Sequence, residues 1–257
     1  GLNENLEGEE MDQSNSVGSG DKANLLLPAP QRKLMEVVAK TGKPVILINM
    51  TGSAMDLRFA EESFSAVAQG WYPGARGGKA IAELLFGKYS FSGKLPVTFY
   101  NDSDELPAFT DYAMENRTYR YFTGGVLYPF GYGLTYGKTE VTKAEMRDDG
   151  EHYTITATVK NEGCAVQEIL QVYVRDNESE FAVRNHSLCA FKAVSLGANK
   201  TCDVEITVPK AALEIVDDTG TRRVDSRSFT FFVGTSQPDD RSAELLGTRP
   251  VAVELKL

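Results

Sequence analysis

The sequence Asn116–Tyr136, NRTYRYFTGGVLYPFGYGLTY, separates two regions of the chain that have different patterns. Within it, Arg117–Phe122 alternates as a β-strand does, whereas the glycines and Pro129 interrupt any longer regular element. Seven of its residues are aromatic, and aromatic side chains bury large areas when they pack. We therefore expect a packed strap, residues 111–138, that crosses one domain and holds a second domain to it.

The region before the strap alternates between helical and strand-like segments. Apolar residues at helical spacing predict helices over the ranges 31–40, 56–62 and 77–86, whereas the ranges 45–49 and 65–70 read as strands and 93–99 as an extended segment. Strand–helix alternation with short connections is typical of an α/β layer structure. So few strands cannot close a three-layer sandwich. We therefore expect the sequence, which starts Gly1-Leu2-Asn3, to be a piece of a longer chain that begins partway through such a domain.

The region after the strap changes to a period of two. Alternation over the ranges 153–159, 169–174, 204–208 and 229–233 predicts strands, and Gly- and Asn-rich turns separate them. Short strands at these intervals indicate an antiparallel, immunoglobulin-like β-sandwich. The expected fold class is thus an incomplete three-layer α/β sandwich followed by an all-β sandwich.

Composition and charge exclude several classes of partner. The net charge of −9 leaves no basic stripe that could neutralise a phosphate backbone, so no nucleic acid partner is expected. No apolar run approaches the length of a membrane span, and no basic-then-apolar signal peptide opens the chain, so no membrane partner is expected.

Cysteines and histidines give no pattern for a metal or a catalytic triad. Cys164, Cys189 and Cys202 lack CxxC spacing, and we expect buried or partly buried thiols on strands, with a Cys189–Cys202 bridge left open. His152 and His186 have polar neighbours and are expected at the surface, which disfavours a triad base. Neither a zinc site nor any other cofactor is expected.

The first residues, GLNENLEGEEMD, are rich in carboxylates, and a Ser/Gly-rich segment follows over the range 13–22. One interpretation is an acidic, solvated loop. The other is a loop that holds a carboxyl group to act as an acid or base, which is how glycosidases use Glu.

Four stretches in this order resemble the C-terminal half of glycoside hydrolase family 3, which holds β-glucosidases and β-xylosidases. They are GLNENLEGEEMD, LLLPAPQRKLMEVVAKTGKPVILINMTGSAMDL, QGWYPGARGGKAIAELLFGKYSFSGKLPVTF and RTYRYFTGGVLYPFGYGLTY. Beyond the strap the resemblance depends on the strand pattern and on Leu188–Leu196, LCAFKAVSL.

The resemblance implies an enzyme of three domains. An N-terminal (β/α)₈ barrel of the same full-length chain would supply the nucleophilic Asp, an α/β sandwich the acid/base Glu, and a fibronectin III-like domain would close the chain. Here residues 1–110 would be the C-terminal part of the α/β sandwich, 111–138 the aromatic linker strap, and 139–257 the fibronectin III-like sandwich. The strap would then serve interdomain packing rather than sugar binding.

The same resemblance implies which glutamate is the acid/base. The family's loop is Glu-x-Glu-Gly or Gly-Glu-Gly and precedes an Asp-Arg pair, for which Asp21-Lys22 stands here. Glu9 is the first choice by its spacing to the Asp, and Glu7, which directly precedes a glycine, is the alternative. This sequence departs from the pattern in having Glu10 where Gly is common and Lys22 where Arg is common.

The physical chemistry of the loop suits an acid catalyst. A retaining glycosidase needs one carboxyl group that protonates the departing oxygen and then deprotonates water, and this group must stay protonated near neutral pH. Like-charge repulsion from Glu7, Glu10 and Asp12 is expected to raise the pKa of Glu9.

The implied function is that of a retaining, exo-acting β-xylosidase or β-glucosidase that acts on plant-type oligosaccharides, secreted or periplasmic rather than cytoplasmic. The 257 residues alone are expected to be inactive because the nucleophile would lie in the barrel. An alternative from another class is a non-catalytic, carbohydrate-associated or scaffolding β-sandwich module.

Overall fold

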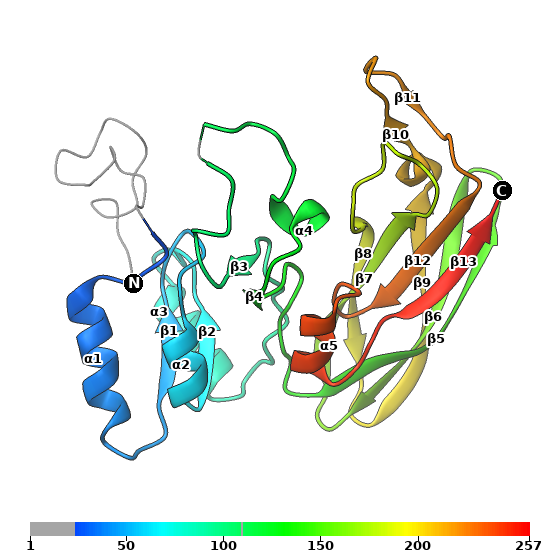
Figure 1. Cartoon of the computed structure of the whole chain (residues 1–257). Helices are drawn as coiled ribbons and strands as arrows, with labels where there is room; N and C mark the ends of the chain where they lie inside the picture. Colours follow the sequence, from blue (N-terminus) through cyan, green and yellow to red (C-terminus); the bar gives the residue numbers. More distant parts are fainter. Residues whose placement is uncertain (1–23, 109) are drawn as a thin grey trace. The chain divides into compact units, whose positions relative to one another are not determined.

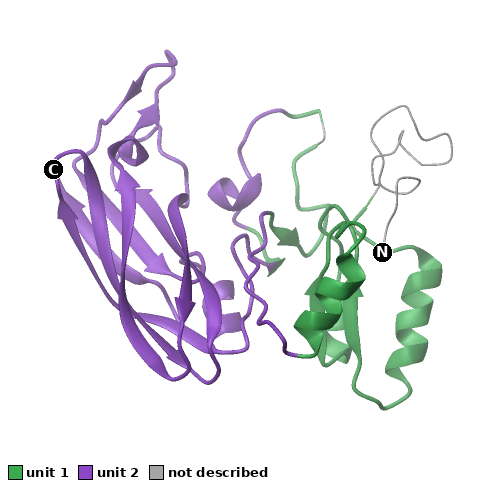
Figure 2. Ribbon diagram, turned by 180° about the vertical axis from the view of Figure 1, so that it is seen from behind, with its two compact units in different colours: residues 1–86, 97–111, 124–127 green, residues 87–96, 112–123, 128–257 purple. Residues whose placement is uncertain are grey.

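A computed structural model describes residues 24–108 and 110–257 of the chain (Figure 1). These residues form two compact units, each made of stretches that are not continuous in sequence (Figure 2). Of the described residues, unit 1 contains 24–86, 97–108, 110–111 and 124–127, and unit 2 contains 87–96, 112–123 and 128–257. The division at residues 110 and 138 that the sequence suggests stays a prediction.

Unit 1 has the α/β pattern that the sequence predicts. Strands β1 (Ile46–Asn49) and β2 (Ala66–Gln69) pair in parallel, and helix α2 (Arg58–Ser63) connects them. Helix α1 (Ala29–Ala39) precedes β1, and helix α3 (Gly77–Leu85) follows β2. A short sheet of β3 (Phe99–Tyr100) and β4 (Val126–Tyr128) completes the regular elements of this region.

Unit 2 is the expected β-sandwich. One sheet has the strand order β5-β6-β9 and the other β13-β12-β7-β8, with antiparallel pairing throughout. The bounds are β5 (Lys138–Asp148), β6 (His152–Glu162), β7 (Val166–Asp176), β8 (Ser187–Leu196), β9 (Lys200–Pro209), β12 (Ser228–Gly234) and β13 (Val251–Lys256). Three smaller elements follow β9: the 3₁₀ helix η1 (Lys210–Leu213), a hairpin of β10 (Ile215–Val216) and β11 (Arg222–Arg223), and helix α5 (Asp240–Leu246).

The sandwich core forms because alternate residues of the facing strands are apolar. Ile155, Ala157 and Val159 of β6 are fully buried, and they share one cluster with Phe231 and Val233 of β12. Side chains alternate between the faces of a strand, so a period of two places one whole apolar set between the sheets. This alternation is the reason that these strands were predictable.

The prediction of a strand over Arg117–Phe122 is wrong. This segment contains one helical turn, α4 (Thr118–Tyr121), and Thr118 has a φ of +56°. The Asn185 side-chain amide donates to the carbonyl oxygens of Tyr119 and Phe122, each at 2.9 Å. The Asn185 side chain thus satisfies carbonyl groups that a neighbouring strand would otherwise bind. Because Asn185 is distant in sequence, the local pattern cannot reveal this.

Residues 87–96 belong to unit 2 although they precede the strap in sequence. The Leu95 amide donates to the Tyr132 carbonyl (2.8 Å), and the Gly131 amide donates to the Leu95 carbonyl (2.7 Å). Nearby, Lys94 Nζ lies 2.9 Å from the Glu168 carboxylate on β7, with only 9% and 2% of the two side chains exposed. A buried ion pair therefore joins this segment to the sandwich.

Candidate functional site

The carboxyl ends of β1 and β2 carry a polar cluster, which we define as the buried Asn49 and Thr51 together with the half-buried Gln69. Asn49 and Gln69 are register partners at the last positions of the two parallel strands. Asn49 Nδ2 donates to Thr51 Oγ1 (3.0 Å) and to Gln69 Oε1 (2.7 Å), and Gln69 Nε2 donates to the Thr51 carbonyl (3.0 Å). In open α/β sheets this edge is where ligands bind. The cluster is therefore the candidate site of unit 1.

The backbone after β2 turns sharply at this edge. The Gly70 amide donates to the Asn49 carbonyl (2.7 Å), and Trp71 has a φ of +52°, which is unusual for a residue with a bulky side chain. The Trp71 ring packs edge-on against Phe99, with centroids 6.4 Å apart. Trp71 therefore holds a constrained turn at the end of a strand.

Residues 24–27, which follow the acidic segment in sequence, are anchored beside the loop that leaves β1. The Asp56 amide donates to the Leu25 carbonyl (2.7 Å), and Arg32 Nε donates to the Leu27 carbonyl (3.0 Å). Leu27 is buried. Residues 50–57 connect the carboxyl end of β1 to α2. The hydrogen bond between Leu25 and Asp56 therefore lies in the connection that leaves the same edge of the sheet as the polar cluster.

The Asp56 carboxylate fixes the start of α2. It accepts hydrogen bonds from the backbone amide of Arg58 (3.1 Å) and from the guanidinium of the same residue (2.9 and 2.7 Å). Burial acts to raise the pKa of Asp56, but the hydrogen bonds and charge of Arg58, together with the charge of Arg32, lower it overall. Asp56 is therefore an ionised anchor near neutral pH, and not a proton donor.

The predicted catalytic residues, Glu9 and Glu7, lie outside the described residues, as do Glu10, Asp21 and Lys22. Their assignment stays a prediction. The polar cluster itself was missed by the sequence analysis. Its signal was the polar residue that ends each of two apolar strands, at Asn49 and Gln69, which becomes informative only once the strands are known to be neighbours.

The prediction of surface histidines is wrong for His186, which is 4% exposed. Its polar sequence neighbours suggested exposure, but the ring packs among aromatic residues of unit 2. His152 is half-buried and lies 2.9 Å from the Asp149 carboxylate.

The prediction for the cysteines holds only for one of them. Cys164 and Cys202 are exposed, Cys189 is half-buried on β8, and all three are free, so the Cys189–Cys202 bridge is not formed. Burial raises the pKa of the Cys189 thiol to about 12, which leaves it protonated and unreactive.

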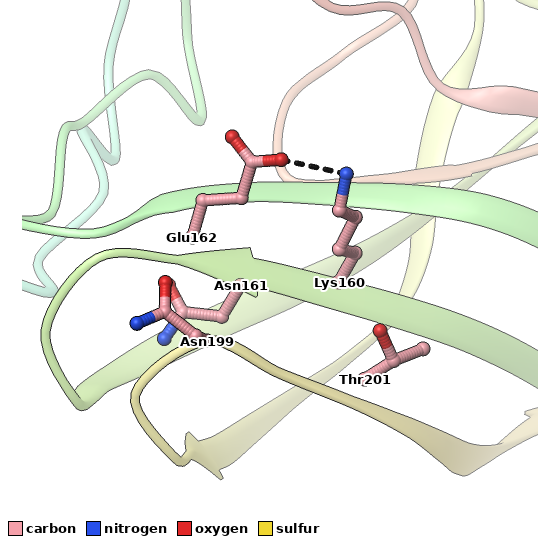
Figure 3. Close-up of a pocket in the computed structure, with 5 residues that line it drawn as sticks. All are labelled: Lys160, Asn161, Glu162, Asn199 and Thr201. Atoms are coloured by element: carbon pink, nitrogen blue, oxygen red, sulfur yellow. Dashed lines mark ion pairs between the residues drawn. The ribbon is translucent and has the colours of Figure 1, made fainter.

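A surface depression of about 380 Å³ lies near one end of β6 and β9 in unit 2. Figure 3 shows the residues that line it, namely Lys160, Asn161, Glu162, Asn199 and Thr201. Lys160 and Glu162 pair with each other at 2.6 Å, and Asn161 Nδ2 donates to the carbonyls of Cys164 and Gly197. The lining includes no aromatic platform for a sugar ring, and its two charged side chains neutralise each other, so we do not take the depression as a candidate site.

Within residues 24–108 and 110–257, no group of three or more His, Cys, Asp or Glu side chains could hold a metal ion. Among the helices that the structure describes, none is both long and apolar enough to cross a membrane.

Comparison with known proteins agrees with this architecture. Residues 1–136 match the glycosyl hydrolase family 3 C-terminal domain, and residues 168–237 match a fibronectin type III-like domain. A xylan 1,4-β-xylosidase of Xylanibacter ruminicola is 39% identical over 244 residues, which is 93% of this chain and 28% of that protein. A periplasmic β-glucosidase of Salmonella typhimurium is 29% identical over 84% of this chain and 30% of that protein.

Solved structures give the same result. A β-glucosidase from Streptomyces venezuelae, 27% identical, superposes with a TM-score of 0.79 over 95% of this chain and 33% of that chain. A family 3 β-glucosidase from Bifidobacterium adolescentis, 25% identical, gives a TM-score of 0.81 over 94% and 37%. The chain spans about a third of the length of these relatives. With its α/β unit, its β-sandwich and a family match over residues 1–136, the chain belongs to glycosyl hydrolase family 3, as its C-terminal domain followed by a fibronectin type III-like domain.

Proposed function

We propose that this chain is the C-terminal portion of a retaining, exo-acting β-glycosidase that removes single sugars from plant-type oligosaccharides. The match of residues 1–136 to the family 3 C-terminal domain carries this proposal, because the matched range includes the acidic segment. The chain supplies the acid/base glutamate, and a barrel domain of the full-length protein supplies the nucleophilic Asp.

Glu9 is the proposed acid/base, with Glu7 as the alternative. In the first step it protonates the departing glycosidic oxygen, and in the second it removes a proton from the water that releases the sugar. Neighbouring carboxylates at Glu7, Glu10 and Asp12 favour the protonated form of Glu9 near neutral pH through charge repulsion.

The described residues that follow the acidic segment in sequence are 24–27. They are anchored through the Leu25 carbonyl to the Asp56 amide, near the sheet edge that carries Asn49 and Gln69. This is the edge at which open α/β sheets bind their ligands.

A β-xyloside is the first substrate to test. The xylan 1,4-β-xylosidase of Xylanibacter ruminicola is 39% identical over 93% of this chain, whereas the Salmonella typhimurium β-glucosidase is 29% identical. Purified full-length protein should be assayed on aryl β-xylosides, β-glucosides and α-arabinofuranosides. If it turns over no glycoside, the non-catalytic β-sandwich module replaces this proposal.

The role of Glu9 is tested by Glu9→Gln in the full-length enzyme, with Glu7→Gln as the matched control. Loss of a general acid removes about 10²–10⁴-fold in rate on xylo-oligosaccharides but spares dinitrophenyl glycosides, whose leaving groups need no proton. Azide should restore turnover of Glu9→Gln and yield a glycosyl azide, because it needs no general base.

Glu7→Gln should show no azide rescue. Rescue at Glu7 instead of Glu9 would exchange the two roles. Rescue at neither position would show that the acid/base lies elsewhere in the protein.

A further inference from the structure

A buried histidine lies at the point where the strap contacts the β-sandwich of unit 2. His186 precedes β8, and its ring lies 5.3 Å from that of Tyr173 on β7, at 88°, and 5.9 Å from that of Tyr119 on α4. Tyr119 also stacks on Phe130 of the strap, with centroids 4.2 Å apart. We call Tyr119, Phe130, Tyr173 and His186 the clasp.

Two residues close to His186 in sequence bind the strap, Asn185 at the strap backbone and Leu188 at the Tyr119 hydroxyl. The Asn185 amide donates to the Arg120 carbonyl (2.9 Å), and the Asn185 side chain donates to the carbonyls of Tyr119 and Phe122. The Leu188 amide donates to Tyr119 Oη (2.9 Å). The position of the 185–188 segment, and with it that of the His186 ring, therefore determines whether α4 stays bound.

The clasp lies outside the main core of the sandwich. Val172 and Val174 on β7 belong to the apolar cluster between the sheets, whereas Tyr173 does not. Successive side chains of a strand point to opposite faces, so Tyr173 and His186 cover the outer face of this sheet. The clasp can therefore open without unfolding the core.

Binding a second proton to the His186 ring costs free energy in this position. Its Nε2 lies 2.9 Å from Gln237 Oε1, a pure acceptor, so Nε2 carries the proton of the neutral ring. Its Nδ1 is buried and has no hydrogen-bond partner among the described residues. Protonation would place a charge and an unpaired N–H inside the clasp.

The groups around His186 do not remove this cost. The positive charge of Arg175 on β7 disfavours a positive charge on the His186 ring. The Arg175 Nε–H donates to the Asn185 carbonyl (2.8 Å). The Asp239 carboxylate favours the charged ring, but it already caps α5 by accepting from the Ser242 amide.

Other titratable neighbours stay neutral, because burial raises the pKa of Tyr173 well above its usual value and that of Cys189 to about 12. In sum, burial lowers the pKa of His186, and the charge of Arg175 acts in the same direction against the opposing effects of Gln237 and Asp239.

We propose that His186 is a pH-sensitive latch, in which proton uptake at Nδ1 releases α4 and the adjoining strap residues from β7 and β8. The neutral ring is favoured when the clasp is closed, so the clasp is most stable above the ordinary histidine pKa of 6.5 and weakens as the pH falls below it. Because one proton is taken up, the equilibrium constant for opening rises by up to about tenfold per pH unit in that range.

The whole 257-residue chain allows a direct test, because it contains only two histidines. NMR of the imidazole side chains follows both, and His186 should titrate below pH 6.5, the value expected for a free ring. In parallel, amide hydrogen exchange should be measured from pH 7.5 to 5 and corrected for intrinsic rates. Protection at Asn185 and Leu188 should fall by up to about tenfold per pH unit, while the core amides of Ile155 and Ala157 keep theirs.

Two variants complete the test. His186→Phe keeps an aromatic ring but cannot titrate, so its Asn185 and Leu188 amides should exchange with no pH dependence after the same correction for intrinsic rates. His152→Gln is the matched control and should behave as the parent. A His186 that titrates at or above 6.5, or acid loosening that persists in His186→Phe, would overturn the proposal, and the parent titration decides the matter should His186→Phe not fold.

Discussion

Unit 1 and unit 2 differ in how completely their apolar residues are covered. Unit 1 has strands of four residues, and it leaves Leu34, Val37 and Ile46 at least half exposed. Unit 2 has strands of up to 11 residues around one continuous apolar cluster. The motif that contains β1 lies in unit 1, whereas the strap motif lies largely in unit 2 together with the larger buried core. Recognisable sequence therefore extends over both units, and most of the buried packing lies in one of them.

This difference has a direct energetic meaning. Burying apolar surface is the main favourable term in folding, at roughly 25 cal/mol per Å². Both units leave some apolar side chains exposed, but most of the fully buried ones lie in unit 2, which therefore collects most of this term. We expect the global stability of the chain to depend on unit 2, and three substitutions test this from the largest effect to the smallest.

The largest effect is expected from Phe231→Ala, which empties the centre of the sandwich core. Phe231 is fully buried, and truncation of a buried Phe costs roughly 3–5 kcal/mol of the free energy of unfolding. Urea denaturation followed by circular dichroism measures this loss. Leu34→Ala in unit 1, where the side chain is 62% exposed, is the control and should change stability by less than about 0.5 kcal/mol. Similar losses in both variants would remove the distinction between the units.

A second effect concerns the buried Lys94–Glu168 pair. Lys94→Met leaves the Glu168 carboxylate buried without its cation. Its remaining donors are the Thr139 hydroxyl and the Ile169 amide. Removal of one partner of a buried ion pair costs about 3 kcal/mol. The double variant Lys94→Met/Glu168→Leu should recover much of this loss in the same urea experiment. If the double variant is less stable than Lys94→Met, the ion pair stabilises unit 2 by more than an apolar replacement can restore.

The smallest effect is expected at Asp56 in unit 1. Asp56→Ala removes the acceptor that fixes the start of α2 and should cost about 1 kcal/mol, as loss of a helix cap does. The pKa of Asp56 is lowered below 3.8 in the folded chain, so this contribution is complete above that pH and is lost as the pH falls further. Thermal unfolding should therefore separate the variant from the parent by less at pH 3 than at pH 7.

The sequence was sufficient where structure follows from local periodicity. The alternation of Tyr153–Val159 predicted β6, and helical spacing over 77–86 predicted α3. Periodicity failed for α4, because a side chain 63 residues away, Asn185, binds its carbonyl groups. It also missed β5, whose period is interrupted by a bulge between Val141 and Lys143.

The candidate sites were less predictable because they depend on neighbours that are distant in sequence. The cluster of Asn49 and Gln69 exists only through strand register, and the burial of His186 depends on Tyr119 and Tyr173. Glu9 and Glu7 were proposed through a family resemblance that needs no structure. Their roles depend on the experiment with azide.

The packing of segment 87–96 in unit 2 limits where recombination between related genes can exchange the sandwich. The Lys94 of this segment and the Glu168 of β7 lie on opposite sides of the strap in sequence, yet each neutralises the other inside one packed unit. A recombination event at residue 137 between two related genes would take the sandwich and its Glu168 from one parent and residue 94 from the other. Chimaeras whose parents differ at these two positions should be less stable than either parent, by about the cost of breaking a buried ion pair. Exchange of the sandwich should therefore include residues 87–96.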